Sequence, residues 1–401
     1  MQAFGTREMT RKGRSHDEPN LWLAFSGGVI LAAIIWLALH KEGQGAGWKE
    51  GIAEQANRST IKQEHSDSDE TQPSKNMTYM VGVQSGEKVD KKLQSNLDSD
   101  KTNHQEEYNQ PIVRVYITET KSIEKVALED YVRGVVTAEM PLDFGKAALE
   151  AQAMAARTYI IRRLWLDDRT GVYVKVADVT DTQAHQVYRS LKQVKQLQEN
   201  DEVSWRKVDD AVRETSGDII IFGDQPIEAL YFSTSNGYTE NSEEVFSSVL
   251  PYLRSVASPW DKEASPRAQE KVEMRLDDFY DRLGVKAVPA ARNISIELAP
   301  RIIEWTKGRR VKELVVGNKR LSGEEVRHLL GLRSSSFDWV ISKNRITLTT
   351  YGSGHGVGMS QWGAEGMARA GKTAEQIVQH YYSGTRIEKV SKLVNSTGKR
   401  L

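Results

Sequence analysis

The chain has 401 residues, with 55 basic (Lys and Arg) and 55 acidic (Asp and Glu) residues, and it contains no cysteine. The length allows two or three domains of ordinary size. Balanced charge gives no global field that would attract nucleic acid, so we expect no nucleic-acid partner. The lack of cysteine excludes disulfides, thiol catalysis and metal sites with cysteine ligands.

A membrane anchor is predicted near the start of the chain. Residues 21–39 read LWLAFSGGVILAAIIWLAL and carry no charge. As a helix this segment would span about 28 Å, which is enough for a bilayer core. Basic residues in segment 1–20 place that segment in the cytoplasm and the rest of the chain outside. The alternative, a cleaved signal peptide, has a shorter apolar region as a rule.

Composition changes sharply after the anchor. Residues 40–109 are rich in Gln, Ser, Lys, Glu, Asp and Asn and poor in large apolar residues. Such a segment cannot bury enough apolar surface to offset the entropy lost on ordering, so we predict a disordered tether. We expect the ordered domain to cover residues 110–390, followed by a tail at 391–401.

Helices and strands are intermixed in the ordered domain, without the alternating rhythm of a parallel βαβ fold, which favours the α+β class. A mixed subdomain is expected at 266–350. The predicted helices cover 128–140, 146–166, 323–332 and a segment that a capping box opens at 373–376, and the predicted strands cover 112–117, 218–222, 228–235 and 311–317.

One carboxylate is out of place in the first helix. Leu128, Tyr131, Val132, Val135 and Val136 form an apolar stripe at helical spacing, and Glu139 lies on the same face just before Pro141. Apolar neighbours and a helix C-terminus both raise the pKa of a carboxyl group, as a general acid requires. The alternative is a helix-end glutamate that faces solvent or pairs with a basic residue.

The next helix contains two polar residues that need partners if they are buried, Gln152 and Arg157. We expect Arg157 to bind backbone carbonyls or Asp143, as structural support. Asp143 itself is more simply the N-cap of that helix. The sequence therefore offers no evident second catalytic carboxylate.

Two later stretches could bind a polar ligand. Residues 231–244, YFSTSNGYTENSEE, gather hydroxyl and amide side chains, although Asn-Gly between strand-like segments also signals a hairpin. Residues 351–366, YGSGHGVGMSQWGAEG, place glycines around His355 and match no nucleotide-binding fingerprint. The alternative for this stretch is a tight loop with a structural histidine. We find too few donors for a metal site and predict no cofactor.

Three long segments carry a resemblance to a known family. They read EDYVRGVVTAEMPLDFGKAALEAQAMAARTY, YFSTSNGYTENSEEVF with PYLRSVASPWD, and GSGHGVGMSQWGAEGMARAGKTAEQIVQHYYSGT. In order and spacing the sequence resembles the stage II sporulation protein D family of endospore-forming bacteria, which also includes enhancers of cell-wall amidases. The resemblance covers about residues 111–390.

The resemblance implies a lytic transglycosylase that degrades cell-wall peptidoglycan strands during engulfment of the forespore, with Glu139 as the catalytic residue. It implies a central substrate cleft formed by Tyr231, Ser233, Ser235, Asn236, Gly237, His355, Ser360 and Gln361. It also implies a single-pass protein between the mother-cell and forespore membranes that works with stage II sporulation proteins P, an amidase, and M. Some relatives bind zinc partly through cysteines, which this chain lacks.

One carboxyl group suffices for such a reaction, because the attacking hydroxyl belongs to the muramic sugar and no water has to be activated. Two alternatives remain open from the sequence. One is a glycan-binding protein that activates an amidase without chemistry of its own. The other is a hydrolase that uses Glu139 and Asp143.

Overall fold

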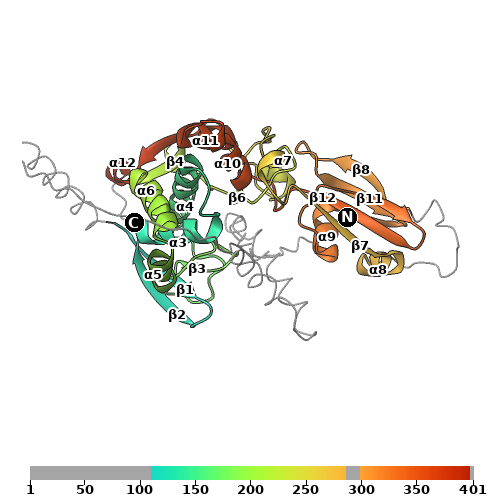
Figure 1. Cartoon of the computed structure of the whole chain (residues 1–401), viewed down its shortest axis with the longest axis horizontal. Coiled ribbons are helices and arrows are strands. Elements are labelled where there is room, and N and C mark those ends of the chain that lie inside the picture. The colour runs from blue at the N-terminus through green and yellow to red at the C-terminus, as the bar shows by residue number, and fades with distance from the viewer. Residues whose placement is uncertain (1–109, 286–298, 398–401) are drawn as a thin grey trace, which may run out of the picture. The chain divides into compact units, whose positions relative to one another are not determined.

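The computed structural model describes residues 110–285 and 299–397 (Figure 1). The predicted cytoplasmic tail, membrane anchor and tether lie outside these residues. Among the helices that are described, none combines the length and the apolar character that crossing a bilayer requires. The described elements mix helices with short sheets, which confirms the α+β class.

Helix α4 (Lys146–Leu166) is the centre of the helical part and has the predicted bounds. All of its alanines except Ala147 are completely buried, and their small side chains let neighbouring elements approach closely. The elements packed around it in Figure 1 are α3 (Leu128–Glu139), α6 (Glu202–Glu214), α10 (Gln361–Arg369), α11 (Ala374–Tyr381) and β4 (Asp218–Phe222). Helix α5 (Leu191–Asn200) packs on α6 and buries a single residue, Val194.

Two small sheets belong to the same hydrophobic core. In one, β1 (Ile112–Ile117) pairs antiparallel with β2 (Ser122–Ala127) and parallel with β3 (Val179–Thr180). In the other, β4 lies between β5 (Gln225–Pro226) and β14 (Arg386–Lys389). The predicted C-terminal tail begins inside helix α12 (Val390–Thr397), because Val390 and Leu393 are buried in this core.

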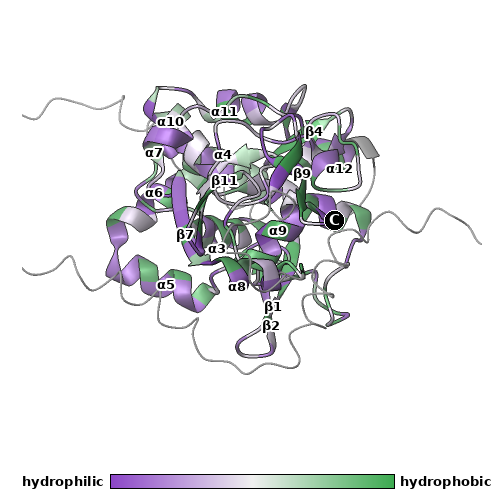
Figure 2. Ribbon diagram, turned by 90° about the vertical axis from the view of Figure 1, so that its right-hand side faces the viewer, coloured by the Kyte–Doolittle hydropathy of each residue, from purple (hydrophilic) through white to green (hydrophobic). Residues whose placement is uncertain are grey.

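Residues 266–350 contain a second hydrophobic cluster, as the predicted subdomain requires. It is formed by two antiparallel sheets and two helices, and β9 is largely hydrophobic in Figure 2. The sheets consist of β7 (Gln269–Arg275), β12 (Arg345–Tyr351) and β11 (Phe337–Ser342), and of β8 (Arg301–Trp305), β9 (Val311–Val316) and β10 (Lys319–Ser322). The helices are α8 (Leu276–Arg282) and α9 (Gly323–Leu330).

The two polar stretches predicted to bind a ligand are joined by a short parallel pair of strands. Strand β6 (Tyr231–Phe232) pairs with β13 (Met359–Ser360). The strand predicted at 228–235 is thus shorter than expected, and the hairpin alternative for the Asn-Gly dipeptide is wrong. The partner strand comes from far along the chain, which local turn signals do not reveal. Short helices follow each stretch, among them α7 (Asp261–Ala264) and a 3-10 turn (Ser242–Glu244).

A buried ion pair fastens α4 to its surroundings. Arg157 is completely buried, and its Nε and Nη2 atoms donate to the two carboxylate oxygens of Glu129 at 2.9 and 2.6 Å. The guanidinium also donates to the carbonyls of Asp218 and Val212. The expected backbone partners are present, whereas Asp143 is not the acidic partner. Asp143 is not the N-cap of α4 either, because that position is Gly145.

Replacing Arg157 by Leu is expected to lower the free energy of unfolding by about 3–5 kcal/mol, because Glu129 would remain buried without its cation. Denaturant unfolding measures this. The double variant Glu129→Leu/Arg157→Leu should be more stable than Arg157→Leu alone. Arg386→Leu, which breaks an exposed pair with Asp224, should change stability by less than about 1 kcal/mol. Equal losses in the single and double variants would contradict the assignment.

Candidate active site

Glu139 is the last residue of α3, and the chain leaves the helix at Met140 in an extended conformation. The break is expected because Pro141 disfavours a helical conformation in the residue before it. No basic residue lies in the last turn of α3. The carboxylate therefore stands at the negative end of a helix dipole without a cation from its own helix.

A loop from β3 to α5 lies directly over the end of α3. The backbone N–H of Val187 donates to Glu139 Oε1 at 2.9 Å. Farther back, Arg189 N–H donates to the carbonyl of Gly134, and the ring of Tyr188 lies so close that a Cβ atom at position 134 would be 2.2 Å from it. Glycine at this position is what allows the loop to reach the carboxylate.

Two of the predicted site residues contact Glu139. Gln361, the first residue of α10, donates through Nε2 to the backbone carbonyl of Glu139 at 3.2 Å. The Tyr231 side chain on β6 acts on the Glu139 carboxyl group and lowers its pKa. Strand pairing between β6 and β13 brings these two residues to the same place, because Gln361 directly follows β13.

Burial raises the pKa of Glu139 above its ordinary value, and hydrogen bonds from Val187 N–H, Tyr231 and Gln361 partly oppose this effect. The direction agrees with the sequence-based expectation. The side chain nevertheless keeps part of its surface exposed. Arg157, the basic residue that could have held the carboxylate ionised, is engaged with Glu129.

His355 is a structural histidine in this arrangement. Its Nδ1 accepts from the Val357 N–H at 3.2 Å, so its Nε2 carries the hydrogen and donates to the Tyr231 carbonyl at 3.1 Å. The imidazole packs between Phe232 and Phe246. Burial, together with Arg327 and Arg310, lowers the pKa of His355 to about 4, so the ring is neutral near pH 7 and orients β6.

Ser235 and Ser360 are buried and do not reach the surface. Both bind Asp261, a completely buried carboxylate that accepts from the Ser235 N–H at 2.7 Å and from the hydroxyls of Ser360 and Ser258. Burial raises the pKa of Asp261, and these hydrogen bonds oppose the rise. In this structure the two serines therefore support the backbone beside the site.

Asn236 is bonded to residues of the 266–350 segment. The Asn236 side chain donates to the carbonyls of Gly308 and Arg309 and to the Ser336 hydroxyl. Gly237 has a φ of +108°, which only glycine adopts readily. Ser233 remains partly exposed next to Tyr231.

Gln152 is completely buried, and neither polar atom of its amide has a hydrogen-bond partner among the described residues. Within residues 110–285 and 299–397, no group of three or more His, Asp or Glu residues is arranged to hold a metal ion.

Sequence reasoning missed three residues. Asp261 lies within the SPWD segment, and Gln186 and Val187 lie in TQAHQVY, a segment without a predicted site residue. Burial of a carboxylate among serine residues is set by tertiary contacts, and a backbone donor such as Val187 N–H has no sequence signature. The one local signal for Asp261 is its position directly after Pro-Trp, which marks it as the start of a helix.

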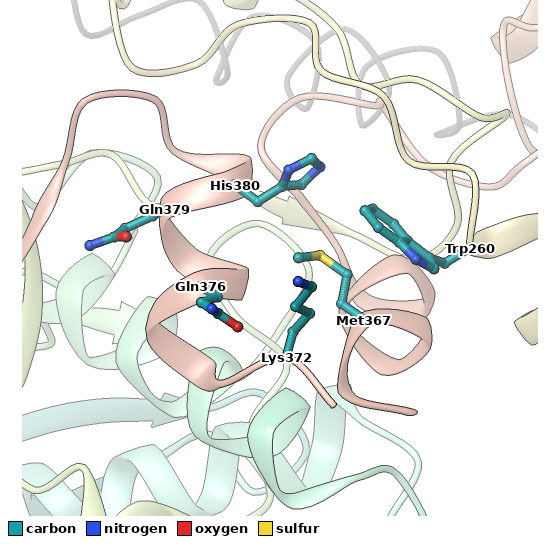
Figure 3. A pocket seen from close by; sticks show the side chains of 6 residues that line it. All are labelled: Trp260, Met367, Lys372, Gln376, Gln379 and His380. Atoms are coloured by element: carbon teal, nitrogen blue, oxygen red, sulfur yellow. The ribbon is translucent and has the colours of Figure 1, made fainter. Parts of the chain in front are cut away.

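A separate concavity of about 380 Å³ lies between α7, α10 and α11 (Figure 3). It is lined by Trp260, Met367, Lys372, Gln376, Gln379 and His380, none of which is a predicted site residue. His380 stands edge-on to the Trp260 ring and bonds the carbonyl of Ala257.

A family model described as "SpoIID: Stage II sporulation protein" matches residues 116–222, which include Glu139. The chain is also 44% identical to the Stage II sporulation protein D of Bacillus subtilis (strain 168) over 284 residues, which are 71% of this chain and 80% of that protein. The chain belongs to the stage II sporulation protein D family.

Other relatives widen the comparison. The Stage II sporulation protein D of Bacillus amyloliquefaciens is 43% identical over 284 residues, which are 71% of this chain and 80% of that protein. A protein named "Amidase enhancer" from Bacillus subtilis (strain 168) is 28% identical over 303 residues, 64% of this chain and 40% of that protein. Family membership associates the chain with sporulation.

Replacing Glu139 by Gln should stabilise the folded chain at pH 7 to 8. Below the ordinary pKa of 4.5 the carboxyl is protonated in the folded and the unfolded chain alike. As the pH rises, the unfolded chain ionises first, since the folded pKa is raised, so the wild type loses stability and the Gln variant does not. The unfolding free energies of the wild type and of Glu139→Gln, measured from pH 4 to 8, should differ more as the pH rises. A difference that is constant with pH would contradict the raised pKa.

Proposed function

We propose that the chain is a lytic transglycosylase that cleaves peptidoglycan glycan strands, in particular strands without peptides, and that Glu139 is its general acid and base. One observation carries the proposal. Glu139 is a partly exposed carboxyl group with a raised pKa, it is surrounded by neutral donors, and no guanidinium or ammonium of the described residues bonds it.

The proposed reaction has two proton transfers. Protonated Glu139 gives its proton to the glycosidic oxygen as the bond from that oxygen to C1 of the muramic sugar breaks. The resulting carboxylate then takes the proton of the muramic C6 hydroxyl, whose oxygen bonds to C1. An anhydro ring forms, the leaving strand keeps the first proton, and Glu139 ends protonated as it began.

The Val187 N–H suits the second half of this cycle, because it donates to a carboxylate oxygen of Glu139. Asp261 is a poor second catalytic group, since it is completely buried and already accepts three hydrogen bonds. Asp143, the second carboxylate of the hydrolase alternative, is exposed. These contacts favour the pathway that needs one carboxyl group.

Glu139→Gln is expected to lower cleavage of peptide-free glycan strands by at least about 10²-fold, because an amide neither gives nor takes the proton. Full-length chain purified in detergent is incubated with the strands, and products are analysed by mass spectrometry. Wild-type products should be one water lighter than those of hydrolysis.

Glu150→Gln is the matched control, because Glu150 also has a pKa raised by burial but lies on α4 and bonds none of the site residues. It should keep wild-type activity. Undiminished cleavage by Glu139→Gln would remove Glu139 from its proposed role. Products carrying ordinary reducing ends would support the hydrolase alternative.

A second candidate function is favoured by the likeness to the protein named "Amidase enhancer". Here the chain binds glycan and activates a cell-wall amidase without chemistry of its own. Full-length chain that releases no product from naked strands, yet accelerates a purified amidase equally well with Glu139 or Gln at position 139, would establish this function in place of the first.

We further propose that residues 21–39 anchor the protein in the membrane. Its N-terminus then lies in the cytoplasm, and the ordered domain, residues 110–390, lies in the space between the mother-cell and forespore membranes. Stage II sporulation proteins P and M are the proposed partners. Trypsin added to intact protoplasts should degrade the ordered domain, residues 110–390, and spare an epitope placed before residue 7. Protection of the whole chain would contradict this topology.

A further inference from the structure

The concavity between α7, α10 and α11 has no part in the reaction proposed above. Of the six side chains that line it, one is a cation, Lys372, and none is acidic. The others are aromatic, amide or thioether groups, and one of them, Gln379, points away from the rest in Figure 3 and donates to Glu375 at 3.0 Å. A hollow with this lining suits a ligand that has both a negative charge and an apolar surface.

The indole of Trp260 is a fixed wall of the concavity. A Cβ atom at position 366 would clash with that of Trp260, so the tryptophan packs directly on the backbone of α10. The next residue, Asp261, is completely buried. His380 stands edge-on to the indole, and its Nε2 donates to the carbonyl of Ala257 at 2.8 Å. A ligand therefore meets an indole that is already in place, which lowers the entropy cost of binding.

The amide and the ammonium that remain free in the concavity are hydrogen-bond donors. In the capping box of α11, the side-chain oxygen of Gln376 accepts from the Thr373 N–H at 3.1 Å, which leaves the Gln376 NH2 group for a ligand. Lys372 has no ion pair or side-chain hydrogen bond with residues 110–285 and 299–397. In Figure 3 its side chain points into the space between Gln376 and Met367. Two neighbouring donors, one of them charged, suit a carboxylate.

We propose that the concavity binds a sugar that carries a carboxylate. Lys372 and the Gln376 amide donate to the carboxylate, and the apolar face of the sugar ring packs on Trp260. Inorganic phosphate would use the donors but not the indole. A neutral sugar would use the indole but leave the ammonium without a partner.

Muramic residues of a peptide-free glycan strand are sugars of this kind. Their lactyl carboxylate is free once the peptide has been removed, whereas in a strand that keeps its peptides the same group is an uncharged amide. The choice of this ligand rests on the proposed function, although the lining of the concavity does not. Lys372 would then be a residue that makes the protein prefer peptide-free strands.

The test measures binding by calorimetry to the full-length chain carrying Glu139→Gln, in which the glycan is not cut. The probe is a peptide-free tetrasaccharide of alternating N-acetylglucosamine and N-acetylmuramic acid. The comparison probe is the same tetrasaccharide with its lactyl carboxylates converted to methylamides. The acid should bind about tenfold more tightly, as one hydrogen bond between charged groups provides, and salt should reduce this difference.

Lys372→Gln should remove the difference by weakening the binding of the acid alone. Lys262→Gln is the matched control, because Lys262 is an exposed lysine of α7 that does not line the concavity, and it should keep the difference. A Lys372→Gln chain that still prefers the acid would overturn the proposal, and so would equal binding of the two probes before Lys372 is changed.

Cleavage assays with Glu139 restored separate this proposal from the proposed function. If both hold, Lys372→Gln should raise KM for peptide-free strands and leave kcat unchanged, because the contact is made equally in the ground state and the transition state. Binding that depends on Lys372 in a chain that releases no product would keep the binding site and reject the enzyme. Cleavage together with binding that does not depend on Lys372 would do the reverse.

Discussion

The site depends on a carboxyl group being kept away from fixed cations. Among the described residues, the Glu139 carboxyl group accepts from a neutral donor, the Val187 N–H, and the neutral Tyr231 side chain lowers its pKa. Two arginines of the helical core are occupied elsewhere, Arg157 of α4 with Glu129, and Arg133 of α3 with Asp130 and Asp209. A cation in contact would stabilise the ionised form and remove the proton that an acid must supply. Ion pairs elsewhere in the core thus preserve the chemistry of the end of α3.

Several residues of types that often act in catalysis have structural roles in this protein. Asp261 draws together Ser235, Ser258 and Ser360, and neutral His355 holds the carbonyl of Tyr231. A buried serine or histidine is satisfied by such partners and has little left for a ligand. Their combined effect is to fix the β6–β13 pair, and through it the places of Tyr231 and Gln361. Few groups therefore contact Glu139, whereas many residues hold those groups in place.

Several helices were predictable from the sequence, but α5, α6 and α8 were not predicted, and contacts between distant segments had no local signal. Periodicity and capping gave α4 with its bounds and the box that opens α11 at Thr373. Glu139 was identifiable because a carboxylate on an apolar stripe breaks a local pattern. Nothing local marks a parallel pairing of residues 231 and 359, nor the partners of Arg157. Gln186 lies in a loop without periodicity, and its buried hydrogen bond comes from Tyr131, 55 residues earlier.

The second hydrophobic cluster is connected to the site through its turn after β8. Arg310, buried between Glu240 and the backbone of Gly356, leaves no room for a side chain on the glycine-rich loop. This loop carries His355 and hence orients Tyr231. Such a scaffold would serve a glycan-binding activator as well as an enzyme. The carboxyl group is the feature that favours the proposed enzyme. Neutral sugars can be bound by amides and hydroxyls, so a binding surface gains nothing from a half-buried carboxylate without a cation and still bears its desolvation cost. Proton transfer is the use that this arrangement fits.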